Sequence, residues 1–435
     1  MPLTAVAFWL TYVSGLTLAV AYPIVGVLVY VLVYHLNPES QWWGTSVRSA
    51  GIPTSMAIAL ATLVGIALRM PRMDPRMRQV PPAIWLSLLL LLVAVASLSW
   101  GYGFNDRGAY QVEKFAKILV FLLIMVRCAS QPGHYHLVVC AWLTGVLYIC
   151  WQAYGDVGTR IGGRLSGGLG GPDFAESSGL AAHLTATLPL VAALFFTARR
   201  WWTRTLLLAV GALTVNAIVL TRTRNAIIGV AAAAVVAALS LPRGYRLRGC
   251  LAIIVGAALA YQLTDPAWWN RMNTLRDYQS DASATSRLAY WDAALTMAWE
   301  HPLGIGVGNF RVAVQDYVAG LSFERSAHNT FLTCLSELGA LGLALLLAVL
   351  TVTMRGLTRV LRRPRDEPPT ALVRAGPWSV RFHLGWHVLA VRSGLAAYLA
   401  CGMFTSRLWT EGSWLLIGMA ACLMNIAVTW PETVR

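Results

Sequence analysis

Apolar residues recur along this chain in continuous stretches that polar segments separate from end to end. A helix of about 20 such residues crosses a hydrocarbon core, and the stretches lack the period of two that a membrane barrel requires. The pattern therefore predicts an all-α, polytopic membrane protein with about 12 transmembrane helices. The expected spans are residues 52–70, 80–98, 112–128, 134–153, 174–197, 205–221, 225–241, 249–263, 329–354, 387–404 and 412–429, in addition to the opening stretch.

The opening apolar stretch, residues 3–36, is too long for one crossing and short for two. Tyr22-Pro23 is the expected break, because proline removes a hydrogen bond from a helix interior. The stretch lacks a small-residue cleavage site and continues into further apolar sequence. We therefore expect a retained segment instead of a removed signal peptide.

Only 12% of the residues are charged, against about 25% in soluble domains, and the net charge is +15. The arginines gather in loops that lie two spans apart, and the positive-inside rule assigns that side to the cytoplasm. Anionic headgroups explain this basicity better than nucleic acid does. The basic loops are 69–78, 199–204, 243–248 and 355–381, and the extracytoplasmic side carries 99–111, 154–173, 222–224 and 264–327.

No soluble domain and no repeat of fixed period interrupts this organisation. We expect N-terminal transmembrane helices over 1–204, a core over 205–354 with one long extracytoplasmic loop at 264–327, a flexible Arg- and Pro-rich cytoplasmic connector over 355–386, and C-terminal transmembrane helices over 387–435. The seven cysteines lie within or beside apolar spans, so no disulfide framework is expected.

The long loop contains apolar residues at helical spacing, namely Leu288, Trp291, Leu295 and Trp299. This spacing predicts an amphipathic helix on the bilayer surface, and a helix packed on the bundle as a cover is the alternative. Either arrangement borders a cavity at the membrane face.

Arginines on the extracytoplasmic side are unexpected under the positive-inside rule. Arg222 and Arg224 flank one residue in a short turn, and a charge near mid-membrane costs about 2.5–3.5 kcal/mol. Arg160 and Arg164 stand in a neighbouring loop, and Arg287 precedes Trp291. Several guanidinium groups facing one side form a site for a phosphorylated group, and the alternative is that each one contacts headgroup phosphates.

Lys114 and Lys117 are the only lysines, and both start the predicted span 112–128 on the extracytoplasmic side. Lys117 is deep enough to need an anionic partner. A bound diphosphate and an ion pair with Glu113 are both open interpretations.

His328 stands where the polar loop ends and the apolar stretch 329–354 begins. An imidazole titrates near neutral pH, which suits a group that abstracts a proton at a membrane boundary. A cap on the following helix and a core histidine bonded to a carbonyl are the structural alternatives.

Other motifs do not support a nucleotide or a metal. Gly304, Gly306 and Gly308 form a glycine-rich run, but no strand precedes it. No cluster of His, Cys or carboxylate residues has metal-ligand spacing, and no Asp-x-Asp motif is present to hold a metal-nucleotide. We therefore expect no metal, no cofactor and no nucleotide-sugar donor.

Four motifs around the long loop resemble the O-antigen ligase and polymerase superfamily of membrane glycosyltransferases, of the Wzy_C type. They occur in the order of that superfamily, within residues 205–350. The motifs are Thr221-Arg222-Thr223-Arg224-Asn225-Ala226, Ser286-Arg287-Leu288-Ala289-Tyr290-Trp291, His301 through Phe310, and His328-Asn329-Thr330-Phe331-Leu332 with Glu337-Leu338-Gly339.

Flanking pieces are similar to a branch of this superfamily, the O-glycosylation ligases that accompany exosortase systems. Two positions depart from the pattern: Asn225 replaces a small glycine, and Cys334 through Gly339 lacks the Gly-Glu-His-Gly of the branch. The similar pieces are Pro23 through Gly26 with Asn37-Pro38, Gly171 through Phe174, and residues 271–275 with 281–284.

The resemblance implies a GT-C-like fold and transfer of a glycan from undecaprenyl diphosphate to a hydroxyl of lipid A-core or of a protein. The reaction would invert the anomeric carbon without a metal, at the periplasmic face of a bacterial inner membrane, among membrane lipids and without nucleic acid. The implied catalytic residues are His328 as general base with Arg287 and Arg224 on the diphosphate. The residues expected to bind substrate are Arg164, Arg160, Arg222, Lys117, Asn329 and Trp291.

Three other functions stay open at this point. A polymerase of the same superfamily would extend one lipid-linked glycan with another, and its product would distinguish it from a ligase. A transporter of lipid-linked oligosaccharides would require ionisable residues near mid-span. A structural scaffold would keep its function after substitution of Arg287 or His328.

Overall fold

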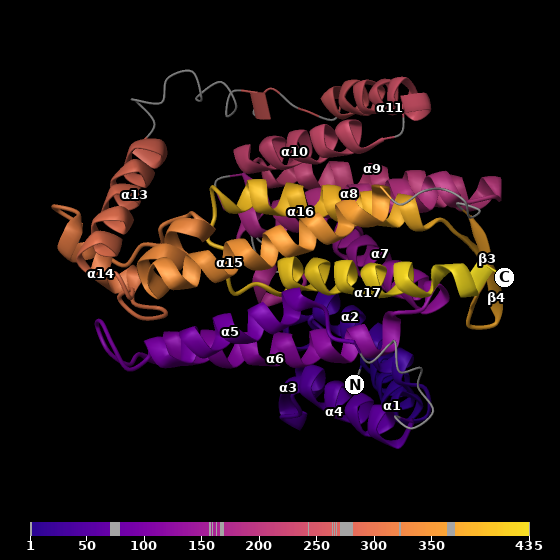
Figure 1. The fold of residues 1–435 in the computed structure, drawn as a ribbon, viewed down its shortest axis with the longest axis horizontal. Helices are drawn as coiled ribbons and strands as arrows, with labels where there is room; N and C mark the ends of the chain where they lie inside the picture. The colour runs from indigo at the N-terminus through magenta and orange to yellow at the C-terminus, as the bar shows by residue number, and fades with distance from the viewer. Residues whose placement is uncertain are drawn as a thin grey trace.

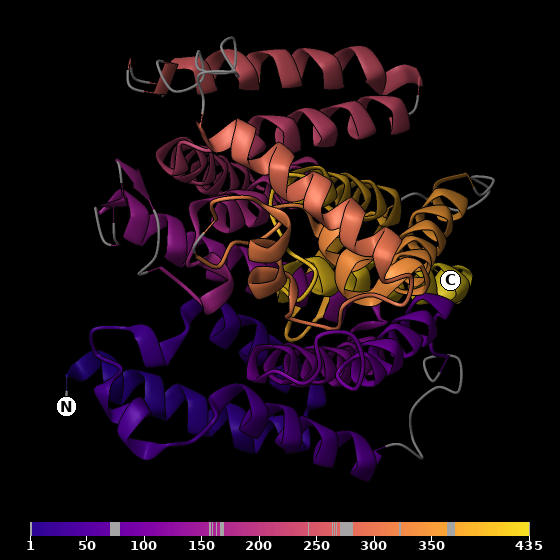
Figure 2. The same ribbon diagram turned by 90° about the vertical axis from the view of Figure 1, so that its left-hand side faces the viewer.

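The chain folds into a bundle of α-helices with two short hairpins. The computed structural model describes residues 2–69, 79–155, 158, 160–161, 163–165, 169–241, 243–262, 264, 266, 268–269, 282–321, 323–362 and 370–434. These residues form sixteen α-helices and two antiparallel two-stranded hairpins. Most long helices run alongside one another, while α13 (Ala282–Glu300) crosses one end of the bundle (Figure 1, Figure 2).

The N-terminal half supplies the first eight helices. The predicted break at Tyr22-Pro23 is confirmed, because one helix ends at Ala21 and the next begins at Pro23. The helices are α1 (Leu3–Ala21), α2 (Pro23–Leu36), α3 (Thr45–Ala50), α4 (Thr54–Arg69), α5 (Pro82–Ser97), α6 (Asp106–Ala129), α7 (Pro132–Tyr154) and α8 (Ser177–Thr197), with short 3₁₀ helices at Pro38–Ser40 and Pro172–Phe174.

The C-terminal half supplies the remaining helices and the longer hairpin. The helices are α9 (Trp201–Thr221), α10 (Arg224–Ser240), α11 (Arg243–Gln262), α13, α14 (Phe310–Tyr317), α15 (Thr330–Arg362), α16 (Leu384–Gly402) and α17 (Glu411–Val434). The hairpins pair β1 (Arg160–Ile161) with β2 (Arg164–Leu165) and β3 (Ala371–Ala375) with β4 (Trp378–Phe382).

The helices have the length and composition of membrane spans. Among the described residues, seven are long and apolar enough to cross a bilayer: α1, α7, α8, α9, α15, α16 and Glu411–Trp430 of α17. The shorter α4, α5 and α10 are apolar as well. Every predicted stretch overlaps a helix, which confirms an all-α, multi-pass membrane protein. The number of about 12 spans stays a prediction.

Burial separates a central group of helices from a peripheral one. In α8 and α17, 72% of the most apolar part is buried inside the protein, whereas in α1 and α9 the share is 22%. The peripheral helices therefore present apolar side chains outward, as lipid-facing helices do. Figure 1 shows α13 and α14 at one end of the bundle, and β3, β4 and the C-terminal end of the chain at the other.

The glycine-rich run packs against a break in α15. Gly339 has a φ of +68°, which interrupts the helix. Ile305 N–H donates to Ser336 O at 2.8 Å, and Gly306 N–H donates to Glu337 O at 3.0 Å. A Cβ on Gly304 would lie 2.4 Å from Glu337 O, so a side chain has no room there. The run is therefore structural, and it fixes the end of α13 to α15.

The predicted helix in the long loop exists as α13, but it packs on the bundle through another face. Leu288 and Leu295 are about half exposed, and Trp299 is 87% exposed. Residues 270–281 of the loop lie outside the described residues. The face that packs beside α14 and α15 consists of Tyr290, Ala293, Ala294 and Met297.

The connector over 355–386 differs from the expectation of a flexible segment. Residues 363–369 lie outside the described residues, but 371–382 form the hairpin β3–β4. Phe382 is fully buried, and a Cβ on Gly133 of α7 would lie 1.6 Å from Arg374 O, so the hairpin packs directly on α7. The expectation of a flexible segment is wrong for residues 371–382. Their charged side chains favoured a solvated connector, but one face of the hairpin is buried.

Candidate active site

Several helix ends meet at the end of the bundle that carries α13 and α14. Thr330, the first residue of α15, donates through its hydroxyl to Thr405 O in the α16–α17 connection at 2.8 Å. Asn225 of α10 donates to Ser178 O in the first turn of α8 at 3.2 Å. The N-termini of α8, α10 and α15 therefore lie at the same end, and their dipoles favour an anion there.

His328 lies directly before α15 in a left-handed backbone conformation, with a φ of +48°. Asn329 caps the helix, because its side-chain oxygen accepts from Phe331 N–H at 2.9 Å and from Leu332 N–H at 3.1 Å. Non-glycine residues adopt this conformation at a cost of about 1–2 kcal/mol, and such strain concentrates at functional sites. The structure gives Asn329 a capping role, and its predicted contact with substrate stays a prediction.

Trp291 fixes the segment that precedes His328. Its indole N–H donates to Ala327 O at 2.9 Å, and its ring lies 6.1 Å from the ring of Phe404. The α13 helix, which also carries Arg287, is thereby attached to the residue next to His328. The structure gives Trp291 a contact with the backbone next to His328, and its predicted contact with substrate stays a prediction.

The electrostatic surroundings keep the imidazole of His328 neutral. Burial is the largest cause that lowers the pKa of His328 to about 4, and the positive charge of Arg287 is the second. Arg407 and Arg325 also lower this pKa, whereas the carboxylate of Glu176 raises it. At neutral pH the ring can therefore accept a proton.

Arg407 is a central residue that the sequence analysis missed. Its side chain is 7% exposed and donates to Glu176 Oε2 at 2.8 Å, to Ser178 Oγ at 3.3 Å, to Thr405 Oγ1 at 3.1 Å and to Asp173 O at 3.2 Å. These bonds join the start of α8 to the α16–α17 connection. The available signal was an arginine in a connection predicted to be extracytoplasmic, which is the signal that singled out Arg160 and Arg164.

The two lysines have different environments. Lys114 is largely buried and pairs with Asp173, whose other carboxylate oxygen accepts from Glu411 N–H at 2.7 Å. Lys117 is 56% exposed and pairs with Glu113, which is the structural interpretation of this lysine. The proposed contact of Lys117 with a diphosphate stays a prediction.

The other arginines predicted to contact the substrate lie in two places, around the hairpin β1–β2 and at the start of α10. Arg222, with a φ of +47°, ends α9, and a Cβ on Gly163 would lie 2.8 Å from its guanidinium. The guanidinium of Arg222 is therefore beside the hairpin that bears Arg160 and Arg164. Arg224 begins α10, whose next residue is bonded to the first turn of α8.

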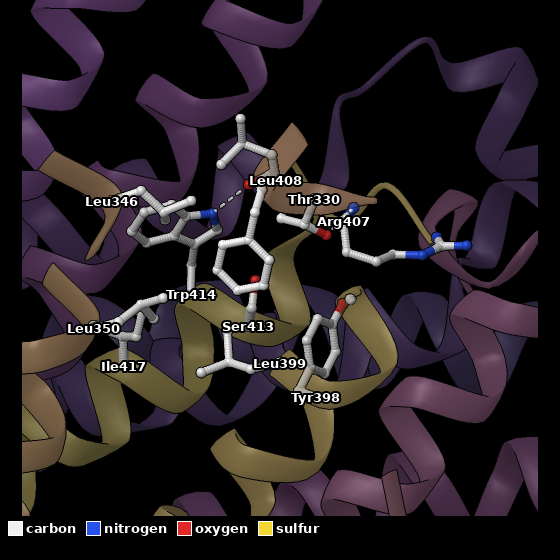
Figure 3. A pocket seen from close by; sticks show the side chains of 12 residues that line it. Thr330, Leu346, Leu350, Tyr398, Leu399, Arg407, Leu408, Ser413, Trp414 and Ile417 are labelled. Carbon is white, nitrogen blue, oxygen red and sulfur yellow. Dashed lines mark hydrogen bonds between the residues drawn. The ribbon is translucent and has the colours of Figure 1, made fainter. Parts of the chain in front are cut away.

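A small cavity lies between α15, α16 and α17, next to Thr330 (Figure 3). Its volume of about 20 Å³ admits a water molecule, so it is too small for an isoprene unit. Leu346, Leu350 and Trp414 line it together with Arg407, whose guanidinium extends away from it. The cavity therefore borders Arg407 and the start of α15.

Comparison with known proteins supports the family resemblance for part of the chain. Residues 209–347 match the family model described as O-antigen ligase. This supports the O-antigen ligase and polymerase superfamily and a membrane enzyme of the ligase or polymerase type. None of the curated proteins matches the chain. The matched segment contains Arg224, Arg287 and His328, whereas Glu176 and Arg407 lie outside it.

Proposed function

We propose that this protein transfers a glycan from undecaprenyl diphosphate to an acceptor hydroxyl of lipid A-core or of a protein. The reaction takes place at the periplasmic face of a bacterial inner membrane. The observation that carries the proposal is the neutral imidazole of His328 within the field of Arg287, inside the segment that matches the ligase family. A base and a cation near each other are what transfer from a diphosphate requires.

His328 acts on the acceptor in this mechanism. The acceptor oxygen attacks the anomeric carbon, its proton moves to the imidazole, and the bond from that carbon to the diphosphate oxygen breaks. The polyprenyl diphosphate leaves with the electron pair, and attack opposite to the leaving group inverts the anomeric carbon. General base catalysis of this kind contributes about 10²–10⁴ to the rate.

Arginines stabilise the leaving group. Arg287 and Arg224 neutralise the negative charge that develops on the diphosphate, and a guanidinium binds phosphate oxygens through two parallel hydrogen bonds. Arg164 and Lys117 extend this contact to the same diphosphate. Arg160 and Arg222 lie beside Arg164 and bind the phosphorylated part of the donor.

The test uses purified protein in vesicles with a labelled undecaprenyl-diphosphate glycan and one candidate acceptor at a time. Transfer of one intact glycan to the acceptor supports the proposed ligase. A ladder of products on the lipid carrier identifies a polymerase instead. Movement of unaltered donor across the vesicle membrane identifies a transporter.

A further inference from the structure

Glu176 is an accessible carboxylate that the proposed reaction has not yet used. It directly precedes α8, and its side chain is 63% exposed. One carboxylate oxygen, Oε2, accepts from Arg407 at 2.8 Å. Because the partner guanidinium is buried, this pair is held more firmly than two flexible surface side chains would be.

Arg407 links Glu176 to the start of α15. Its backbone N–H donates to Thr330 Oγ1 at 2.9 Å, two residues after His328. Its guanidinium lies against the first turn of α8, where a Cβ on Gly179 would be 2.4 Å from Cζ. Arg407 therefore connects the two segments, through its side chain to Glu176 and through its backbone N–H to Thr330.

The charges that act on His328 come from four segments. Arg287 is on α13, Arg325 precedes His328 on its own segment, and Arg407 is in the α16–α17 connection. Glu176, at the start of α8, is the carboxylate among these groups. When His328 takes up the acceptor proton, its new positive charge faces three arginines, and a nearby negative charge offsets that repulsion.

We propose that Glu176, held by Arg407, is a positioning residue that stabilises the protonated imidazole of His328 during glycan transfer. The inference rests on the proposed function of His328 as the base. The proton stays on His328 until the product leaves and then passes to water.

The variant Glu176→Gln removes the charge and keeps an oxygen that Arg407 can bond. The protonated imidazole then lacks its opposing charge, so we expect kcat to fall about three- to tenfold while KM for the donor stays unchanged. The acid limb of the pH profile moves to lower pH by about 0.5–1 unit. Glu176→Asp keeps the charge and restores most of the activity.

Glu324→Gln is the matched control. Glu324 is also a partly exposed carboxylate paired with an arginine, at 2.8 Å from Arg107, and it stands four residues before His328. It is not among the groups with the largest effect on the pKa of His328. We expect its substitution to leave the pH profile in place.

A second measurement does not depend on transfer. Diethyl pyrocarbonate modifies neutral imidazole, and mass spectrometry of peptides follows His328 separately from the other histidines. The pH at which His328 loses reactivity should be lower in Glu176→Gln than in the wild type and in Glu324→Gln. An unshifted profile in Glu176→Gln overturns the inference, even if its kcat falls. Absence of transfer by the wild type contradicts the proposed function instead.

Discussion

His328 combines a left-handed backbone with a neutral imidazole at the end of a long apolar helix. Both properties are energetically unfavourable. The backbone conformation is strained, and the buried ring opposes its own protonation. A base with a low pKa abstracts a proton only where the attacked carbon is already activated, and the proposed diphosphate, held by arginines, would provide that activation.

The first prediction is the pH dependence of transfer. The pKa of His328 is lowered from 6.5 to about 4 in the folded protein, so kcat/KM should be flat above about pH 5.5 and fall as the pH approaches 4. The unfolded chain binds the proton more readily between these two values, so the free energy of unfolding also decreases as the pH falls from 6.5 to about 4. A rate profile with its midpoint near 6.5 would exclude this environment for the base.

Single substitutions test the residues directly. His328→Ala and Arg287→Ala should each lower kcat by about 10²–10⁴ while the protein still expresses and folds. His301→Ala is the control. His301 directly follows α13, and the centroid of its ring lies 6.2 Å from the centroid of the Tyr102 ring. Full activity in both variants would show that the assigned site is wrong.

At the scale of elements, the long apolar helices could be predicted because each contains a continuous apolar stretch, and Pro23 marks a break, whereas the short polar helices α3 and α14 could not. The hairpin β3–β4 could not be predicted, because its one face is buried only by contacts with helices far away in the chain, α7, α16 and α17. His328, Arg287 and Arg224 stand in recognisable motifs. Glu176 and Arg407 are 231 positions apart in the chain, and only the packing of α8 against the α16–α17 connection brings them together.

The junction between the glycine-rich run and α15 gives a prediction about stability. Gly304→Ala adds a Cβ that meets Glu337 O, a backbone atom that cannot move alone. Gly320→Ala is the control, because Gly320 also has a positive φ but no atom within 4 Å of a Cβ. Gly304→Ala should destabilise the protein by about 1–3 kcal/mol more than the control, measured by thermal unfolding in detergent. Equal melting temperatures would mean that the junction adjusts freely.

At the scale of the whole molecule, two ion pairs with a buried member lie at the end of the bundle near His328. Lys114 with Asp173 and Arg407 with Glu176 are ion pairs between segments that are far apart in the chain. Pairing offsets the large cost of removing a charge from water. Three arginines and one glutamate act on His328 at this end, so its surroundings are positively charged, as the proposed release of a diphosphate requires.

The proposed use of arginines leads to a prediction about metals. Because Arg287 and Arg224 supply the positive charge, excess EDTA should leave the rate of transfer by the reconstituted protein unchanged. The control is the same assay with added Mg²⁺, which should give the same rate. A strict requirement for Mg²⁺ would refute catalysis by arginines alone.

The ion pair between Arg407 and Glu176 also bears on how this enzyme class can be re-engineered. The segment that matches the ligase family, residues 209–347, contains the base but neither member of the pair. A chimera that takes only that segment from a relative would combine the base of the relative with Glu176 and Arg407 of this protein. Under the proposed role of this pair, such a chimera should reach full activity only when the start of α8 and the α16–α17 connection are transplanted together with the matched segment.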